Sequence, residues 1–199
     1  MTAQDLFRTG PLTFGVRRYR PSDREAVVGL WKSRFGCTDE LAADWLEEAT
    51  SDYLTACFVA SPAQHGRVLG FGITTVTNEE TTDGWLADGY YGKVDLPEID
   101  LEQRTAVMHI GVTRPECEGE GVATELWKHR LAYARENDAA QAIGTSWHRE
   151  DHVDSSVLFE KFGFEPAKRV KNYYDGDRDD CPDCDGQCTC DATVYWREL

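Results

Sequence analysis

The sequence has few basic residues and no long apolar run. Its 21 lysines and arginines stand against 36 aspartates and glutamates, which gives a net charge of -15 at pH 7. Direct nucleic-acid binding is not expected, because proteins that bind nucleic acids carry a basic patch or stripe. No apolar stretch is long enough to cross a membrane, and the leader, residues 1–12, lacks the basic start and apolar segment of a secretion signal. We therefore expect a cytoplasmic protein that binds no membrane.

The acidic residues are spread along the whole chain, from Asp5 to Glu198. This distribution favours a solvated acidic surface suited to a very salty cytoplasm. An acidic field that guides a basic substrate to its site is the alternative.

Hydrophobic periodicity predicts one α/β domain over residues 1–199. Val27, Trp31 and Phe35 recur at every fourth position, which predicts a helix ended by Gly36, and Ser22 and Glu25 have the spacing of a capping box at its start. The expected order is strand, two helices, three strands, helix, strand, helix and two strands. The strands are predicted within residues 13–21, 53–60, 67–76, 106–112, 141–147, 164–174 and 192–199.

A long polar segment, residues 78–104, carries Trp85, Tyr90 and Tyr91. Loops of this length in a compact domain are usually functional or mobile. We expect it to line the groove of a substrate or, as the alternative, to cover the edge of the sheet.

The stretch RPECEGEGVATELW, residues 114–127, predicts an anion-binding site. Gly119, Gly121 and Ala123 follow a strand and open a helix, where unpaired main-chain N–H groups bind phosphate and glycine lets the chain approach closely. A Gly-x-Gly pair alone is equally compatible with a plain tight turn. Glu118 and Glu120 add two negative charges, but at molar salt the screening length falls to roughly 3 Å. We therefore expect the affinity for the anion to rise with salt.

Five segments resemble the GNAT acetyltransferases. EGEGVATELW after the strand AVMHIGV is similar to the acetyl-CoA motif of that family, with Gly121 and Ala123 at the small positions and Glu118 in place of an Arg or Gln. VRRYRPSDREAVVGLW and SSVLFEKFGF resemble the first strand–helix and the last helix–strand of the family. RVKNYY and DATVYW resemble the tail of enzymes that acetylate protein N-terminal amines, including ribosomal-protein alanine acetyltransferases. The resemblance covers residues 13–199.

The resemblance implies a fold and a reaction. The fold is a single α/β (α+β) GNAT-like domain, with a central mixed, mostly antiparallel sheet of about seven strands flanked by four helices. The reaction is direct attack by a primary amine, for example a peptide or protein N-terminus, on acetyl-CoA; a non-catalytic CoA-binding or protein-interaction module is the alternative. The acetyl-CoA site implied by the family comprises Ile110, Gly111, Val112, Glu118, Gly119, Glu120, Gly121, Val122, Ala123 and Thr124.

The chain departs from the family where the chemistry takes place. Phe159 replaces a tyrosine that protonates the leaving thiolate, Trp147 replaces a glutamate base, and His152 replaces an asparagine on the cofactor side. Histidine can replace the base because its pKa lies near neutrality, and a tyrosine can supply the proton. For each histidine alone, an ordinary structural or surface role is favoured over the catalytic one, and a packed aromatic pair is the alternative for the tyrosines. The candidates are His109, His148, Glu150, His152, Tyr173 and Tyr174.

Four of the seven cysteines are crowded into the insertion at residues 175–191. Cys181, Cys184, Cys188 and Cys190 offer four thiolates, which suit tetrahedral Zn²⁺ in a structural site. Two disulfides are the alternative, but a reducing cytosol disfavours them. An iron–sulfur cluster and a redox sensor also stay open.

Overall fold

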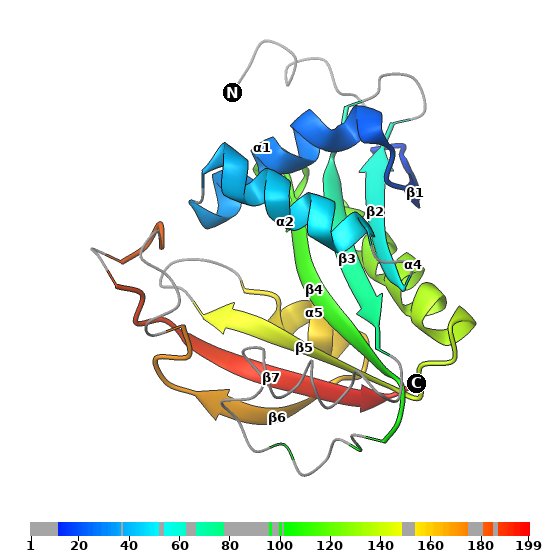
Figure 1. Ribbon diagram of the computed structural model, residues 1–199, viewed down its shortest axis with the longest axis vertical. Coiled ribbons are helices and arrows are strands. Elements are labelled where there is room, and N and C mark those ends of the chain that lie inside the picture. The colour runs from blue at the N-terminus through cyan, green and yellow to red at the C-terminus, as the bar shows by residue number, and fades with distance from the viewer. Residues whose placement is uncertain are drawn as a thin grey trace.

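The computed structural model describes residues 12–36, 38–51, 54–62, 67–77, 96, 100, 102–148, 154–174, 181–184 and 187–199. Within them, seven strands and four α-helices follow one another in the predicted order (Figure 1). The predicted leader, Trp85, Tyr90 and Tyr91 of the long loop, and part of the cysteine-rich insertion lie outside the described residues. The elements are β1 (Gly15–Arg18), α1 (Arg24–Phe35), α2 (Asp39–Ser51), β2 (Thr55–Ser61), β3 (Gly70–Val76), β4 (Thr105–Thr113), α4 (Val122–Glu136), β5 (Gln141–His148), α5 (Ser156–Lys161), β6 (Glu165–Val170) and β7 (Asp191–Glu198).

The strands form one sheet in the order β1-β2-β3-β4-β5-β7-β6. Neighbouring strands are antiparallel except β4 and β5, which run parallel, so the predicted mixed, mostly antiparallel sheet is confirmed. Because β7 lies between β5 and β6, the start of β7 pairs with the end of β5, where Asp191 faces His148. This pairing brings the cysteine-rich segment beside β5.

Helices cover both faces of the sheet (Figure 1). Successive side chains of a strand point to opposite faces. In β2, Phe58 accordingly belongs to the apolar cluster under α4 and α5, whereas Val59 belongs to the cluster under α1 and α2. Within the described ranges, no helix is both long enough and apolar enough to cross a bilayer.

The start of α1 differs from the capping box predicted at Ser22. The helix begins at Arg24, and its N-cap residue is Asp23, whose carboxylate makes no cap hydrogen bond. Instead, the buried carboxylate accepts hydrogen bonds from two guanidinium nitrogens of Arg17, at 2.6 and 2.8 Å, and from the main-chain N–H of Arg20, at 2.8 Å. The capping-box prediction was wrong because Ser22 lies inside the short 3-10 turn Pro21–Asp23 and does not cap α1. The Asp23 carboxylate is held by Arg17 of β1 and by the turn after β1. The predicted end at Gly36 is confirmed, with φ 75°.

Candidate active site

A large cleft opens where β4 and β5 diverge. The two strands pair from Thr105–Met108 against Gln141–Gly144, and they separate beyond that point (Figure 1). The cleft has a volume of about 1270 Å³. Its walls come from β4, the start of α4, β5, α5, the end of α1 and the turn after β6.

The start of α4 forms one end of the cleft. Gly119 and Gly121 have φ values of 77° and 85°, in the region that favours glycine. A side chain built on either would meet no atom within 4 Å, so the space in front of the helix is open. In the described chain, the first main-chain bond into the helix joins Glu125 N–H to Gly121 O, and no main-chain acceptor is found for the amides of Val122 and Ala123. These amides can therefore bind an anion.

Most of the predicted acetyl-CoA residues line this cleft. The exception is Glu120, which does not contribute to its walls. The predicted residues in the walls are Ile110, Gly111, Val112, Glu118, Gly119, Gly121, Val122, Ala123 and Thr124.

Basic side chains from two other helices approach the acidic rim. Arg34 of α1 lies in the cleft wall with its Nη1 3.9 Å from Oε1 of Glu118. Lys161 of α5 donates a hydrogen bond to the Thr124 hydroxyl at 3.0 Å. The negative charge of Glu118 is therefore partly compensated by a cation on the opposite side of the opening.

A β-bulge interrupts β4 at the middle of the cleft. Gly72 pairs with Gly111 and Thr74 pairs with Met108, so His109 and Ile110 together oppose Ile73. The guanidinium of Arg130, only 1% exposed, donates to Ile73 O at 2.6 Å and to His109 O at 2.9 Å. A buried cation therefore fixes the irregular backbone at the wall of the cleft.

His109 lies in the cleft wall as a neutral imidazole. Its Nε2 is 3.0 Å from the Thr75 hydroxyl oxygen. Burial and the nearby Arg130 guanidinium lower the pKa of His109 to about 3. At neutral pH the imidazole is therefore unprotonated, and its pKa is too low for the general base expected at this position.

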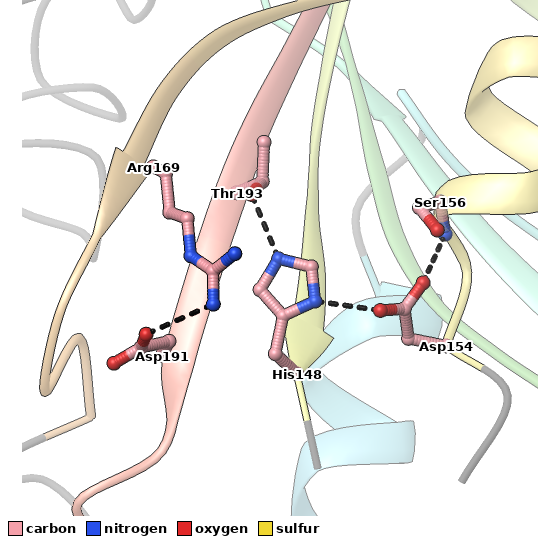
Figure 2. Close-up of polar contacts among 6 residues, drawn as sticks. All are labelled: His148, Asp154, Ser156, Arg169, Asp191 and Thr193. Carbon is pink, nitrogen blue, oxygen red and sulfur yellow. Dashed lines mark hydrogen bonds and ion pairs between the residues drawn. The ribbon is translucent and has the colours of Figure 1, made fainter. Parts of the chain in front are cut away.

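His148 belongs to a polar network beside the cleft. Figure 2 shows its ring between Asp154 and Thr193, with Nδ1 2.6 Å from Asp154 Oδ2 and Nε2 2.7 Å from Thr193 Oγ1. Asp154 lines the cleft, whereas His148 does not. Burial alone would raise the pKa of the Asp154 carboxyl, but hydrogen bonds from Ser156 and His148 lower its pKa overall. Glu150 and His152 lie outside the described residues.

An aromatic wall, composed of Phe35, Trp147, Tyr173 and Tyr174, lines another part of the cleft. The Trp147 ring stacks on Phe35 with centroids 5.6 Å apart and meets the edge of Tyr174 at 5.5 Å. Tyr173 packs edge-on against Tyr174 at 5.0 Å and is buried. Trp147, which stands where the family has a glutamate, therefore links the end of α1 to the turn after β6.

Phe159 occupies a packed apolar position at the divergence of β4 and β5. Its ring stacks on Tyr195 at 4.7 Å and meets Trp127 edge-on at 4.8 Å. A methyl group at Gly144 would lie 2.5 Å from the Phe159 ring, so the glycine permits this close contact. A phenyl ring has no proton to give to a thiolate, so Phe159 cannot act as an acid.

The structure brings the four predicted metal ligands together. The sulfurs of Cys181, Cys184, Cys188 and Cys190, called here the cysteine cluster, all lie within 4.8 Å of one another. Cys190 Sγ is 3.7 Å from Cys184 Sγ and 3.9 Å from Cys181 Sγ. The cluster lies in the connection from β6 to β7, directly before β7.

Three site residues were missed by sequence reasoning: Arg34, Arg130 and Asp154. The signal for Arg130 is its place between Trp127 and Leu131 in the buried stripe of α4, where a charged residue needs a polar partner. Nothing in the local sequence distinguishes Arg34, because its partner Glu118 comes from a distant element. Asp154 bonds to residues close in sequence, so its spacing of two from Ser156 is the signal that could have found it.

Comparisons with known proteins agree with this geometry. The family model described as "Acetyltransferase (GNAT) family" matches residues 25–164. A comparison with curated protein sequences finds no significant match.

Similar solved structures include Arabidopsis thaliana NAA60 in complex with acetyl-CoA, with 13% identity over 94% of this chain and 99% of that chain and a TM-score of 0.67. The ribosomal-protein-S18-alanine N-acetyltransferase from Escherichia coli has 16% identity over 94% of each chain and a TM-score of 0.61. The ribosomal-protein-alanine N-acetyltransferase from Brucella melitensis has 15% identity over 93% and 99% of the chains and a TM-score of 0.62. These similarities show the fold, and the family match shows that the chain belongs to the acetyl-CoA-dependent GNAT acetyltransferase family.

Proposed function

We propose that the protein transfers the acetyl group of acetyl-CoA to the N-terminal α-amine of a peptide or protein. The observation that carries the proposal is one cleft whose lining includes both an open helix start with main-chain donors and an aromatic wall. The names of two similar structures, both ribosomal-protein alanine N-acetyltransferases, support an N-terminal acceptor.

The two parts of the lining bind different substrates. The diphosphate of acetyl-CoA lies against the amides of Gly119, Gly121, Val122 and Ala123, because these residues line the cleft. The pantetheine follows the β4 backbone at residues 110–112, on the side that β5 leaves open. The acceptor enters along the aromatic wall, so its amine meets the thioester near the bulge of β4.

The reaction is a direct acyl transfer. The neutral amine nitrogen attacks the thioester carbonyl, the C–N bond forms, and the C–S bond breaks as the sulfur leaves with its electron pair. The nitrogen then gives its excess proton to solvent water, and the thiolate takes up one proton. Positioning of the two reactants and hydrogen bonds to the developing oxyanion provide most of the acceleration.

The cleft itself favours the neutral amine. Burial and the Arg130 cation, which lower the pKa of His109 to about 3, also lower the pKa of an ammonium group bound beside that ring. The acceptor therefore releases its first proton on entry, and no side chain with a near-neutral pKa is required. Tyr174, at the edge of Trp147 in the cleft wall, is the proposed donor to the thiolate in place of Phe159.

The non-catalytic alternative has its own support. Phe159 and Trp147 replace the acid and base of the family, so a chain that binds CoA without turnover is the second candidate. It predicts binding of acetyl-CoA with no acetylation of any amine.

Mass spectrometry of peptides incubated with acetyl-CoA tests the function. We expect a mass gain of one acetyl group on peptides with a free N-terminus and none on matched peptides whose N-terminus is blocked but whose lysine is free. Trp147→Ala should raise the acceptor KM and leave acetyl-CoA binding unchanged. Acetylation of the lysine alone would contradict the N-terminal acceptor, and binding of acetyl-CoA without turnover would support the non-catalytic module.

We also propose that the cysteine cluster holds a structural Zn²⁺ ion. Four thiolates complete a tetrahedral shell and leave no position for substrate. The ion therefore supports the fold and takes no part in acyl transfer.

A further inference from the structure

The cysteine cluster has the dimensions of a site for a single metal ion. Four sulfurs held at about 2.3 Å from one tetrahedral ion are about 3.8 Å apart. The distances from Cys190 Sγ to the sulfurs of Cys184 and Cys181 are 3.7 and 3.9 Å. A disulfide needs about 2.05 Å between sulfurs. The arrangement also disfavours a cluster of several irons, in which the thiolates bind different metal atoms and lie further apart.

The surroundings of the sulfurs match a metal–thiolate site. Cys181 and Cys188 are buried, although they lie in a polar segment whose residues Pro182 and Gln187 are exposed. The main-chain N–H of Thr189 is hydrogen-bonded to the Cys184 sulfur. Such contacts orient and stabilise thiolate ligands from the second layer of a metal site.

The cluster is joined directly to the aromatic wall of the cleft. The N–H of Tyr173 donates to Cys190 O at 3.0 Å, and Trp147 of β5 pairs with Ala192 of β7, two residues after Cys190. One residue further on, Asp191 accepts from the N–H of Asn172 at 3.2 Å and from the Arg169 guanidinium at 3.2 Å. Figure 2 shows the Arg169–Asp191 contact beside His148.

We infer that a metal ion in the cysteine cluster fixes the aromatic wall and thereby sets the affinity for the acceptor. This inference rests on the proposed function for the acceptor side of the cleft. A segment as short as the one that carries the four cysteines cannot form a core of its own, so metal binding supplies the free energy that orders the cysteine cluster. Without the ion, Cys190 no longer holds Tyr173, and the acceptor must order the aromatic wall when it binds. The amides proposed for the diphosphate belong to the start of α4, an element that contains none of the four cysteines.

Metal analysis tests the site itself. Protein purified without chelator should contain about one zinc ion per chain, and Cys184→Ser and Cys188→Ser should lose it. Cys57→Ala is the matched control, because Cys57 is buried in the core under α1, away from the cluster. Cobalt exchanged into the site should give the visible bands of a tetrahedral cobalt–thiolate complex. Wild-type protein with no bound metal, or cobalt bands that persist in both serine variants, would overturn the inference.

Kinetics test the link to the acceptor. Removal of the ion with a chelator should raise the acceptor KM about tenfold, while acetyl-CoA affinity stays within about twofold. Added zinc should restore the acceptor KM of wild-type protein but not of Cys184→Ser. An equal loss of acetyl-CoA binding, or unfolding of the whole chain by circular dichroism, would refute a role confined to the acceptor wall.

The two proposals fail in different ways. If no amine is acetylated but the ion is bound and its removal makes residues 171–190 sensitive to protease, the acceptor assignment fails and the metal site stands. If amines are acetylated equally well with and without the ion, the inferred link fails and the acyltransfer stands.

Discussion

The glutamate at the start of α4, Glu118, determines how acetyl-CoA binding responds to salt. Glu118 lies at the open start of α4 and is partly compensated by Arg34, 3.9 Å away. Two unit charges about 7 Å apart in water repel by about 0.6 kcal/mol, so a diphosphate with two charges is repelled by about 1.2 kcal/mol. Without compensation, Glu118 therefore weakens binding about sevenfold at low salt.

We expect Glu118→Gln to tighten acetyl-CoA binding about threefold in the wild-type background and up to about sevenfold in an Arg34→Gln background, where nothing offsets the acid. Calorimetric titration in about 0.1 M and about 1 M KCl measures both effects, because the screening length falls from about 10 Å to about 3 Å. At high salt the variants should converge, and wild-type affinity should rise.

Glu136→Gln is the matched control for charge. It removes one acid at the far end of α4, about 20 Å along the helix. Wild-type affinity that falls steadily with salt would refute the reasoning. An identical effect of Glu136→Gln would assign the repulsion to the net charge of -15 and not to the rim.

Three further predictions concern the core of the site. Arg130→Met should lower the free energy of unfolding by about 2–4 kcal/mol in chemical denaturation, because two buried carbonyl groups lose their donor; an unchanged midpoint would contradict this. Gly144→Ala should cost about 1–3 kcal/mol through its clash with Phe159, and Phe159→Leu should recover part of that loss. Stability should fall as the pH drops from about 6.5 towards 3, since the unfolded chain then protonates His109 and the folded chain does not. His109→Gln should make this fall shallower, and a pH–rate limb near neutrality that this variant abolishes would contradict the proposed pKa.

The fold was largely predictable because its signals are local. The four-residue steps of Val27, Trp31 and Phe35 mark α1, and Gly36 adopts the left-handed conformation that ends it. Gly119 and Gly121, which the sequence placed before a helix, likewise adopt positive φ values. The cysteines are close in sequence, so the cluster was also visible.

The features that the sequence did not predict depend on long-range contacts. Arg130 bonds to Thr74, 56 residues away, and the β4 bulge appears only when β3 is paired beside it. Val157 of α5 is apolar, yet it is 59% exposed and lines the cleft. Periodicity identifies apolar positions, but it cannot tell a core contact from the wall of a binding site.

The short parallel ladder between β4 and β5 has a consequence for melting. It joins the β1–β4 half of the sheet to the β5–β7–β6 half through Thr105–Met108 and Gln141–Gly144. A ligand between the diverging ends contacts both halves, and at about one hundred times its Kd it adds about 2.7 kcal/mol to the folded state. Acetyl-CoA bound at the proposed site therefore stabilises the contact between the two halves of the sheet. A thermal-shift assay can measure this binding before any acceptor is known.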